Sequence, residues 1–237
     1  MSVIWHDLEC GTYAADMGLW RELADRCGDP VLDVGAGTGR ITLDLARRGH
    51  RVTALDRDPA LIAELGLRAA GLGVSTAIAD ARSFELQERF PLIIVPMQTI
   101  QLLGGGPGRI EFLARARGHL MSGGLVAVAI SDTLELYDSG QGLPIPVPDI
   151  RELDGVVYSS QPTAVREDGD GFVLERLRET VSPDGDRTEE HDLIRLDRLS
   201  ASTLEAEAQL SGLRSGGRRL IPPAADHVGS VVVMLGG

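Results

Sequence analysis

The sequence predicts a doubly wound α/β fold, in which helices cover both faces of a mostly parallel sheet. Three observations lead to this prediction. A short, mainly aliphatic stretch at residues 31–34 runs into three alternating glycines and then into an amphipathic helical pattern at 41–48. Strand and helix patterns alternate again over 51–79. The continuous apolar run at 92–95 is typical of a parallel strand that is buried on both faces.

Composition limits the class of protein. The chain has 237 residues, of which 43% are hydrophobic, and its net charge of −12 disfavours a nucleic-acid partner. No apolar run approaches the ~20 residues that cross a bilayer, and residues 1–16 lack a targeting pattern, so we expect a cytoplasmic protein with no membrane partner. Two cysteines provide neither a disulfide framework nor a metal site.

Four segments are expected in order. Residues 1–30 form an N-terminal helical cap, with one helix over 8–27, and residues 31–131 form the α/β core. Residues 132–199 form an inserted antiparallel β meander, because a proline-rich stretch is followed by three alternating stretches separated by Asp/Gly turns. Residues 200–237 return to the core as one helix over 200–210, with Ser200 as its N-cap, and two strands.

The glycine loop, residues 35–39, is the strongest local signal. Gly35, Gly37 and Gly39 let the main chain approach a ligand closely, and the free N–H groups of the following helix face the loop. A dinucleotide fingerprint requires a small residue where Arg40 stands, which argues against NAD. Asp56 follows the second strand 21 positions after Gly35, close to the spacing of about 20 at which an acid reaches ribose hydroxyls.

These residues resemble the first motif of the class I S-adenosylmethionine-dependent methyltransferases of the small-molecule type. The run at 90–96 is similar to their fourth motif, with Pro91 in place of the usual Asp. After an expected flexible loop at 104–108, the helix at 109–121, the turn at 122–124 and the strand at 125–130 also match. The resemblance implies a Rossmann-like, seven-stranded sheet that ends in an antiparallel pair at 213–221 and 228–235. It also implies S-adenosyl-L-methionine as cofactor and S-adenosyl-L-homocysteine as product.

The resemblance also assigns cofactor contacts. The glycine loop would wrap the amino-acid end of the cofactor, Tyr13 would cover it, and the main chain at Met97 would lie under its sulfur. Asp80 would accept a hydrogen bond from the adenine amine, although it could simply cap the helix that follows. The predicted cofactor-binding residues are Tyr13, Asp33, Gly35, Ala36, Gly37, Gly39, Asp56, Arg57, Asp80, Ala81 and Met97. Asp58, followed by Pro59, is assigned to capping a helix instead.

The sequence leaves open which molecule and which atom accept the methyl group. An amine needs only to arrive neutral, whereas a hydroxyl needs a base. Gln98 and Gln101 could orient an acceptor, and His6, His191 or His227 could overlook the pocket, although a structural histidine is the alternative for each. We therefore predict methyl transfer to a small molecule, with nitrogen slightly favoured, by a monomer or homodimer. The alternatives are O- or C-methylation with a histidine base, and a non-catalytic cofactor-binding module.

Overall fold

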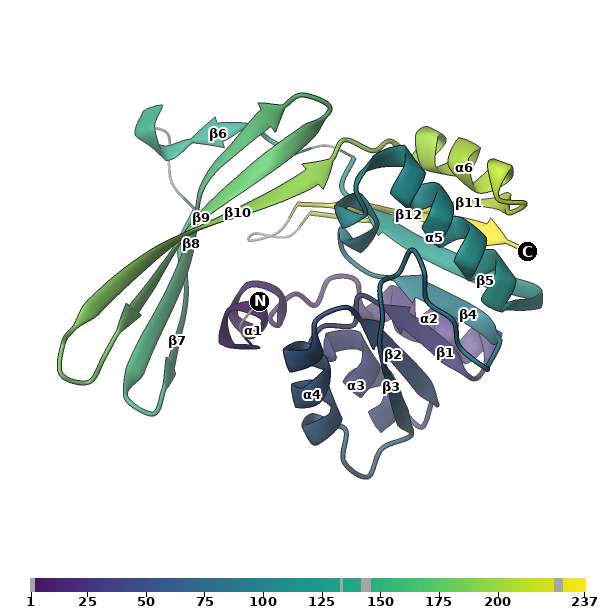
Figure 1. Cartoon of the computed structure of the whole chain (residues 1–237), viewed down its shortest axis with the longest axis horizontal. Helices are drawn as coiled ribbons and strands as arrows, with labels where there is room; N and C mark the ends of the chain where they lie inside the picture. The colour runs from purple at the N-terminus through teal and green to yellow at the C-terminus, as the bar shows by residue number, and fades with distance from the viewer. Residues whose placement is uncertain (1–2, 133, 142–145, 224–227) are drawn as a thin grey trace.

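The computed structural model describes residues 3–132, 134–141, 146–223 and 228–237, and it confirms the predicted fold class (Figure 1). Sheet A has seven strands in the order β11-β12-β5-β4-β1-β2-β3, and sheet B is a separate antiparallel sheet. The strands of sheet A are β1 (Val31–Val34), β2 (Val52–Asp56), β3 (Val74–Ile78), β4 (Phe90–Val95), β5 (Leu120–Ile130), β11 (Arg214–Ile221) and β12 (Ser230–Gly236). As the resemblance implied, β11 and β12 form an antiparallel pair, and β12 also runs antiparallel to β5.

Successive side chains of the central strands point to opposite faces of sheet A, and both sets are apolar, which explains why helices cover both faces. In β4, Leu92 and Ile94 pack against α2 (Met17–Cys27) and α3 (Arg40–Arg47). Ile93 and Val95 point the other way, toward α5 (Gly105–His119) and α6 (Ala201–Leu210). All four β4 side chains are fully buried, which is the reason for the continuous apolar run in the sequence.

Two predicted helix starts are confirmed. Asp58 precedes α4 (Pro59–Arg68) and accepts hydrogen bonds from the N–H groups of Ala60 and Leu61, with Pro59 at the first helical position. Ser200 caps α6 by accepting from Thr203 N at 3.1 Å. In the described ranges, no helix has the length and apolar character that spanning a membrane would require.

The single helix predicted over 8–27 is wrong. The chain forms α1 (Val3–Cys10) and α2 separately, and Tyr13 lies in the connection between them. The Arg40 guanidinium donates to Tyr13 O at 2.8 Å and to Asp16 Oδ1 at 2.6 Å. A tertiary contact with α3 therefore overrides the helical periodicity at this point.

Two predicted loops are also wrong. Gly104 has a left-handed φ of 82° and caps α5, so the glycines at 105–108, which were expected in a flexible loop, form the first turn of that helix. Residues 122–124 were expected to turn before strand five, but they lie within β5, where Gly123 has φ 73°. The register between β4 and β5 shifts at this place, as at a β-bulge.

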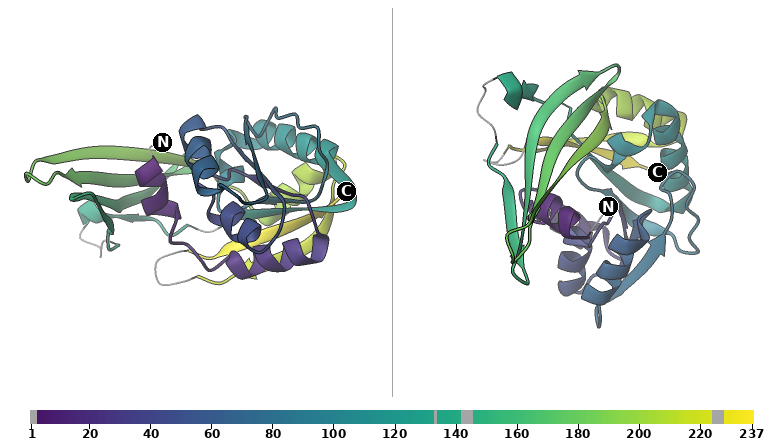
Figure 2. Two further views of the ribbon diagram at one scale, coloured as in Figure 1. Left: turned by 90° about the horizontal axis from the view of Figure 1, so that it is seen from below. Right: turned by 60° about the vertical axis from the view of Figure 1, so that its left-hand side comes forward.

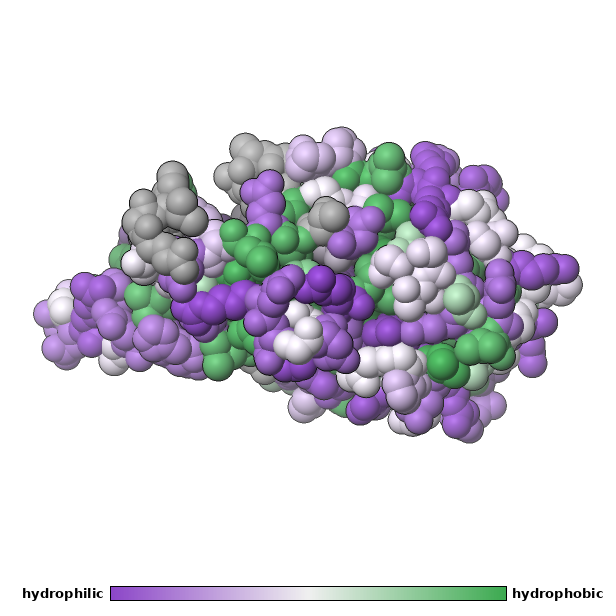
Figure 3. Space-filling view, turned by 90° about the horizontal axis from the view of Figure 1, so that it is seen from above, coloured by the Kyte–Doolittle hydropathy of each residue, from purple (hydrophilic) through white to green (hydrophobic). Residues whose placement is uncertain are grey.

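Sheet B confirms the predicted meander and extends away from the core (Figure 2). Its long strands are β8 (Val156–Asp168), β9 (Gly171–Val181) and β10 (Arg187–Asp197), and the sequence did not predict β6 (Tyr137–Asp138) or β7 (Asp149–Leu153). The far end of the sheet is mainly hydrophilic, whereas hydrophobic surface gathers nearer the junction with the core (Figure 3). Residues 146–148 carry no regular structure, as the prolines predicted, and residues 142–145 lie outside the described ranges.

Leu65 and Leu67 of α4 offer a test of which face of this helix is buried in the core. Leu65 is fully buried and packs beneath the glycine loop, whereas Leu67 is 75% exposed in the same helix. We expect Leu65→Ala to lower the free energy of unfolding by about 2–5 kcal/mol, because it leaves a cavity. Leu67→Ala should change it by about 0.5 kcal/mol or less. Urea unfolding measures both variants, and equal losses would contradict the assignment.

Candidate functional site

The glycine loop joins β1 to α3 at the carboxyl edge of the parallel strands. Gly35 and Gly37 have left-handed φ angles of 74° and 55°. A Cβ on Gly35 would lie 2.5 Å from Thr99 Cγ2, and a Cβ on Gly37 would lie 2.1 Å from His6 Nε2. Both the backbone angles and the close neighbours therefore require glycine, as the sequence predicted.

Asp56 ends β2 and faces this loop. Its Oδ2 accepts from Gly37 N at 2.9 Å, and its Oδ1 accepts from Asp58 N at 3.0 Å. These two backbone donors fix the orientation of a half-buried carboxylate. Each oxygen keeps a lone pair that could accept from a hydroxyl group, so the geometry fits a ribose diol.

Asp33 in β1 is a second acid at the loop, and its side chain is almost fully buried. Oδ2 accepts from Thr42 Oγ1 at 2.7 Å, whereas Oδ1 has no hydrogen-bond partner among the described residues. Burial raises the pKa of Asp33 to about 6, and the negative charge of Asp56 adds to that rise. A buried carboxylate with an open acceptor fits the ammonium end of an amino-acid ligand.

Asp80 follows β3, and its carboxylate is held by Arg82. The backbone N–H of Arg82 donates to Oδ1 at 2.8 Å, and its guanidinium NH2 donates to Oδ2 at 2.6 Å. These hydrogen bonds lower the pKa of Asp80 to about 2. The carboxylate thus stabilises its own turn, and its contact with adenine stays a prediction, as do the roles of the half-buried Ala81 and the exposed Arg57.

The segment after β4 carries backbone strain. Met97 has φ 55°, a left-handed conformation that is uncommon outside glycine and that gathers at functional sites. Gln98 is half-buried and its Nε2 donates to Ser131 Oγ at 2.9 Å. Gln101 is almost fully buried, and its amide donates to Ser131 O and Asp197 O. Gln101 is therefore a structural residue, and the prediction that it orients an acceptor is not retained.

Tyr13 lies beside the start of α3. Its ring is buried, and the Arg40 guanidinium carbon lies 5.1 Å from the ring centroid. Burial raises the pKa of the Tyr13 hydroxyl, and Asp16 adds to this effect. Tyr13 therefore lies close to the glycine loop, which α3 follows directly. Its role in covering the cofactor stays a prediction.

The structure brings one candidate histidine to the glycine loop. His6 Nδ1 lies 3.2 Å from Thr38 Oγ1, and burial lowers the pKa of the imidazole. His191 is exposed, and it lies on the face of β10 opposite to that of its neighbour Asp192, which pairs with Arg178. His227 lies outside the described residues. His119 is the last residue of α5 and accepts from Leu86 N at 3.0 Å, so its role is structural.

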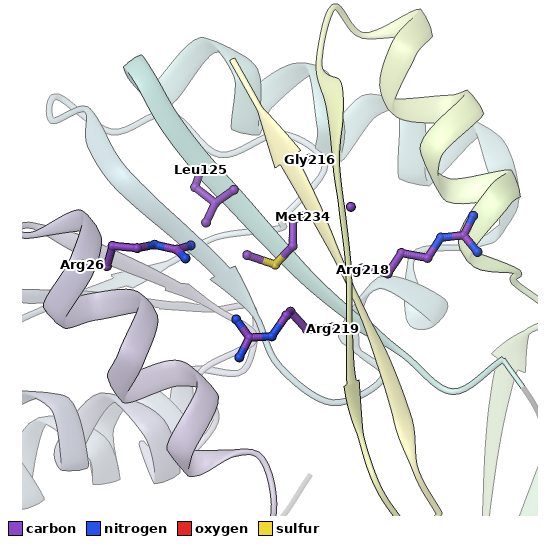
Figure 4. A pocket seen from close by; sticks show the side chains of 7 residues that line it. Arg26, Leu125, Gly216, Arg218, Arg219 and Met234 are labelled. Carbon is purple, nitrogen blue, oxygen red and sulfur yellow. The ribbon is translucent and has the colours of Figure 1, made fainter.

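Two hollows of the described surface lie away from the glycine loop. One of about 290 Å³ is formed by β11, β12, β5 and α2 (Figure 4), with Arg26, Leu125, Gly216, Gly217, Arg218, Arg219 and Met234 as its lining. Another of about 230 Å³ is lined mainly by residues at the amino ends of β2 and β3. Neither includes a residue of the glycine loop. The described residues hold no group of three or more His, Cys, Asp or Glu side chains that could bind a metal ion.

Comparison with known proteins supports the sequence resemblance. A family model described as a methyltransferase domain matches residues 31–124, which include the glycine loop, Asp56 and Asp80. The chain is 35% identical over 103 residues to a protein of Methanothermobacter thermautotrophicus named as a probable cobalt-precorrin-6B C(15)-methyltransferase (decarboxylating). The match covers 42% of this chain and 51% of that protein, so the chain spans about half the length of this relative.

Solved structures resemble the whole chain. CalS10, an amino pentose methyltransferase of Micromonospora echinaspora, aligns with a TM-score of 0.74 and 19% identity over 98% of this chain and 96% of that chain. The sugar N-methyltransferase KedS8 of Streptoalloteichus aligns with a TM-score of 0.74 and 18% identity over 97% of this chain and 90% of that chain. At these identities the likeness shows the fold alone, including sheet B.

The raised pKa of Asp33 predicts a pH dependence. Above about pH 4 the unfolded chain ionises Asp33, whereas the folded chain keeps it protonated until about pH 6. Its contribution to stability therefore falls as the pH rises through this window and stays constant above it. We expect Asp33→Asn to gain stability relative to wild type between pH 4 and 7, as measured by urea unfolding. A difference in stability between Asp33→Asn and the wild type that does not change with pH over this range would contradict the prediction.

Proposed function

We propose that the protein is an S-adenosylmethionine-dependent methyltransferase that acts on a small-molecule amine. The observation that carries this proposal is the pairing of Gly37 N with the Asp56 carboxylate, which joins the glycine loop to a strand-end acid. The methyltransferase-domain match over residues 31–124 supports it independently.

The residues of the loop suit the parts of this cofactor. Asp56 would accept hydrogen bonds from the ribose hydroxyls, and the open oxygen of Asp33 would receive the ammonium group. Tyr13 would cover the site, and the strained backbone at Met97 would lie near the reacting centre. When bound, the cofactor supplies a methyl group on a positive sulfonium, which a nucleophile displaces in one in-line step.

We propose nitrogen as the acceptor atom. A neutral amine attacks without a base, so catalysis needs only orientation and exclusion of water, which can supply about 7–11 kcal/mol. Gln98 could orient the acceptor through its carbonyl, because its amide nitrogen is engaged by Ser131. The name of KedS8, a sugar N-methyltransferase of the same fold, is consistent with this class. Sheet B, which lies beyond the carboxyl ends of the core strands, would cover the acceptor.

A second candidate function is methylation of a hydroxyl with His6 as base. His6 lies against the glycine loop, and its lowered pKa keeps the imidazole neutral, as a general base must be.

Calorimetry tests the cofactor assignment. S-adenosylhomocysteine should bind the wild type with a micromolar Kd, about 8 kcal/mol, and NAD should not bind. Asp56→Ala should weaken binding at least about tenfold, because the ribose would lose its charged acceptor. Asp184→Ala, at the exposed tip between β9 and β10, is the control and should bind normally. A folded wild type that does not bind S-adenosylhomocysteine would overturn the proposal.

Turnover on a panel of amines and phenols tests the acceptor. We expect S-adenosylhomocysteine to form with an amine, at a rate that rises with pH through the pKa of that amine, because only the neutral form carries a free lone pair. His6→Ala should keep this pH dependence. Turnover with phenols alone, with a pH dependence that is lost in His6→Ala at saturating S-adenosylmethionine, would support the second candidate instead. Binding without turnover on any acceptor would favour a non-catalytic module.

A further inference from the structure

Helix α1 lies between the glycine loop and sheet B (Figures 1 and 2). On the core side, His6 lies against Gly37, and Asp7 accepts from Thr38 Oγ1 at 2.7 Å. Asp7 also receives both terminal nitrogens of Arg68 in α4, at 3.0 and 2.6 Å. His6 and Asp7, in the middle of α1, therefore fix the helix to the cofactor side of the molecule.

Glu9 fixes the same helix to sheet B. Arg178 of β9 donates to both carboxylate oxygens, at 2.7 and 2.9 Å, and Ser160 of β8 donates to Oε1 at 2.7 Å. The side chains of Glu9 and Arg178 are each only 4% exposed. Arg178 also pairs with Asp192 of β10 at 2.9 Å. Glu9 is therefore joined directly to β8 and β9, and through Arg178 to β10.

An aromatic contact supports the ion pair. Trp5 packs edge-on against Tyr158 of β8, with ring centroids 5.6 Å apart. The Arg178 guanidinium lies 5.5 Å from the centroid of the Trp5 ring, so the same arginine contacts α1 twice.

The position of α1 depends on these contacts. The helix has eight residues, too few to be stable alone in water. Burial alone would raise the pKa of Glu9, but the hydrogen bonds from Arg178 and Ser160 outweigh it and hold that pKa below its usual range. Glu9 is therefore charged at neutral pH, and a bidentate pair of this kind fixes orientation as well as distance.

We propose that Glu9, through Arg178, is a positioning residue of the cofactor site. The pair holds α1 so that His6 closes over the glycine loop, which makes sheet B part of the cofactor-binding structure as well as a cover for the acceptor. Glu9 itself does not touch the cofactor. This inference rests on the proposed function, because the ligand is S-adenosylmethionine or its product.

The chain contains a matched control pair. Glu207 of α6 accepts from Arg109 of α5 at 2.8 and 2.7 Å, and the side chains are 11% and 6% exposed. This pair has the same bidentate geometry and similar burial, yet neither residue contacts α1 or the glycine loop among the contacts of the described residues. Glu9→Gln and Glu207→Gln should therefore lose similar stability.

The experiment is calorimetric titration of S-adenosylhomocysteine into full-length variants whose folding is checked by circular dichroism. Glu9→Gln should weaken binding about 3- to 30-fold, whereas Glu207→Gln should bind like the wild type. Ser160→Ala removes one hydrogen bond to Glu9 and should weaken binding in the same direction by a smaller factor. It serves as the test if Glu9→Gln does not fold.

A double-mutant cycle with His6→Ala separates positioning from general destabilisation. If Glu9 acts through α1, Glu9→Gln should cause little further loss of affinity once His6 is removed. Additive losses, an unchanged affinity in Glu9→Gln, or equal losses in Glu207→Gln would each overturn the inference while the proposed function stands. A wild type that does not bind S-adenosylhomocysteine would overturn both.

Discussion

The left-handed backbone of the glycine loop is the constraint on which the rest of the site depends. Without side chains at Gly35 and Gly37, Thr99 can approach from the end of β4 and His6 from α1. The same turn directs Gly37 N toward Asp56, so the loop conformation also orients the acid of the neighbouring strand. A Cβ on Gly35 or Gly37 would therefore push the segment after β4, or α1, away from the β1–α3 turn.

The parts of the fold that were predicted correctly depend on local rules. Alternating glycines, Asp58 with Pro59, and Ser200 before a helix each act within a few residues of themselves, so a single sequence contains the whole signal. The meander is similar, because Asp/Gly turns define the β8–β9 and β9–β10 hairpins. The spacing of Asp56 from Gly35 placed this acid beside the glycine loop, where it lies, because parallel strands bring their carboxyl ends to one edge of the sheet; its contact with the ribose stays a prediction.

The parts that were missed depend on residues far apart in the chain. The break between α1 and α2 is set by Arg40, 27 residues from the Tyr13 carbonyl to which it donates. Gln101 had the character of a substrate contact, but its amide joins Ser131 and Asp197, which are 30 and 96 residues away. No periodicity in the sequence encodes such pairs. For the same reason, the sequence did not predict a role for Glu9, because its partner Arg178 is 169 residues away in the chain.

Apolar burial stabilises the core, whereas buried ion pairs orient sheet B and α1 relative to the core. Apolar burial on both faces of sheet A makes the core rigid. The joints between the core and sheet B are instead ionic, since Arg109, Arg176 and Arg178 each pair with two carboxylates. Buried pairs of this kind add little net stability, because desolvation offsets attraction, but they require one geometry. The core thus supplies most of the stability, while the arginines determine how the meander and α1 face the glycine loop.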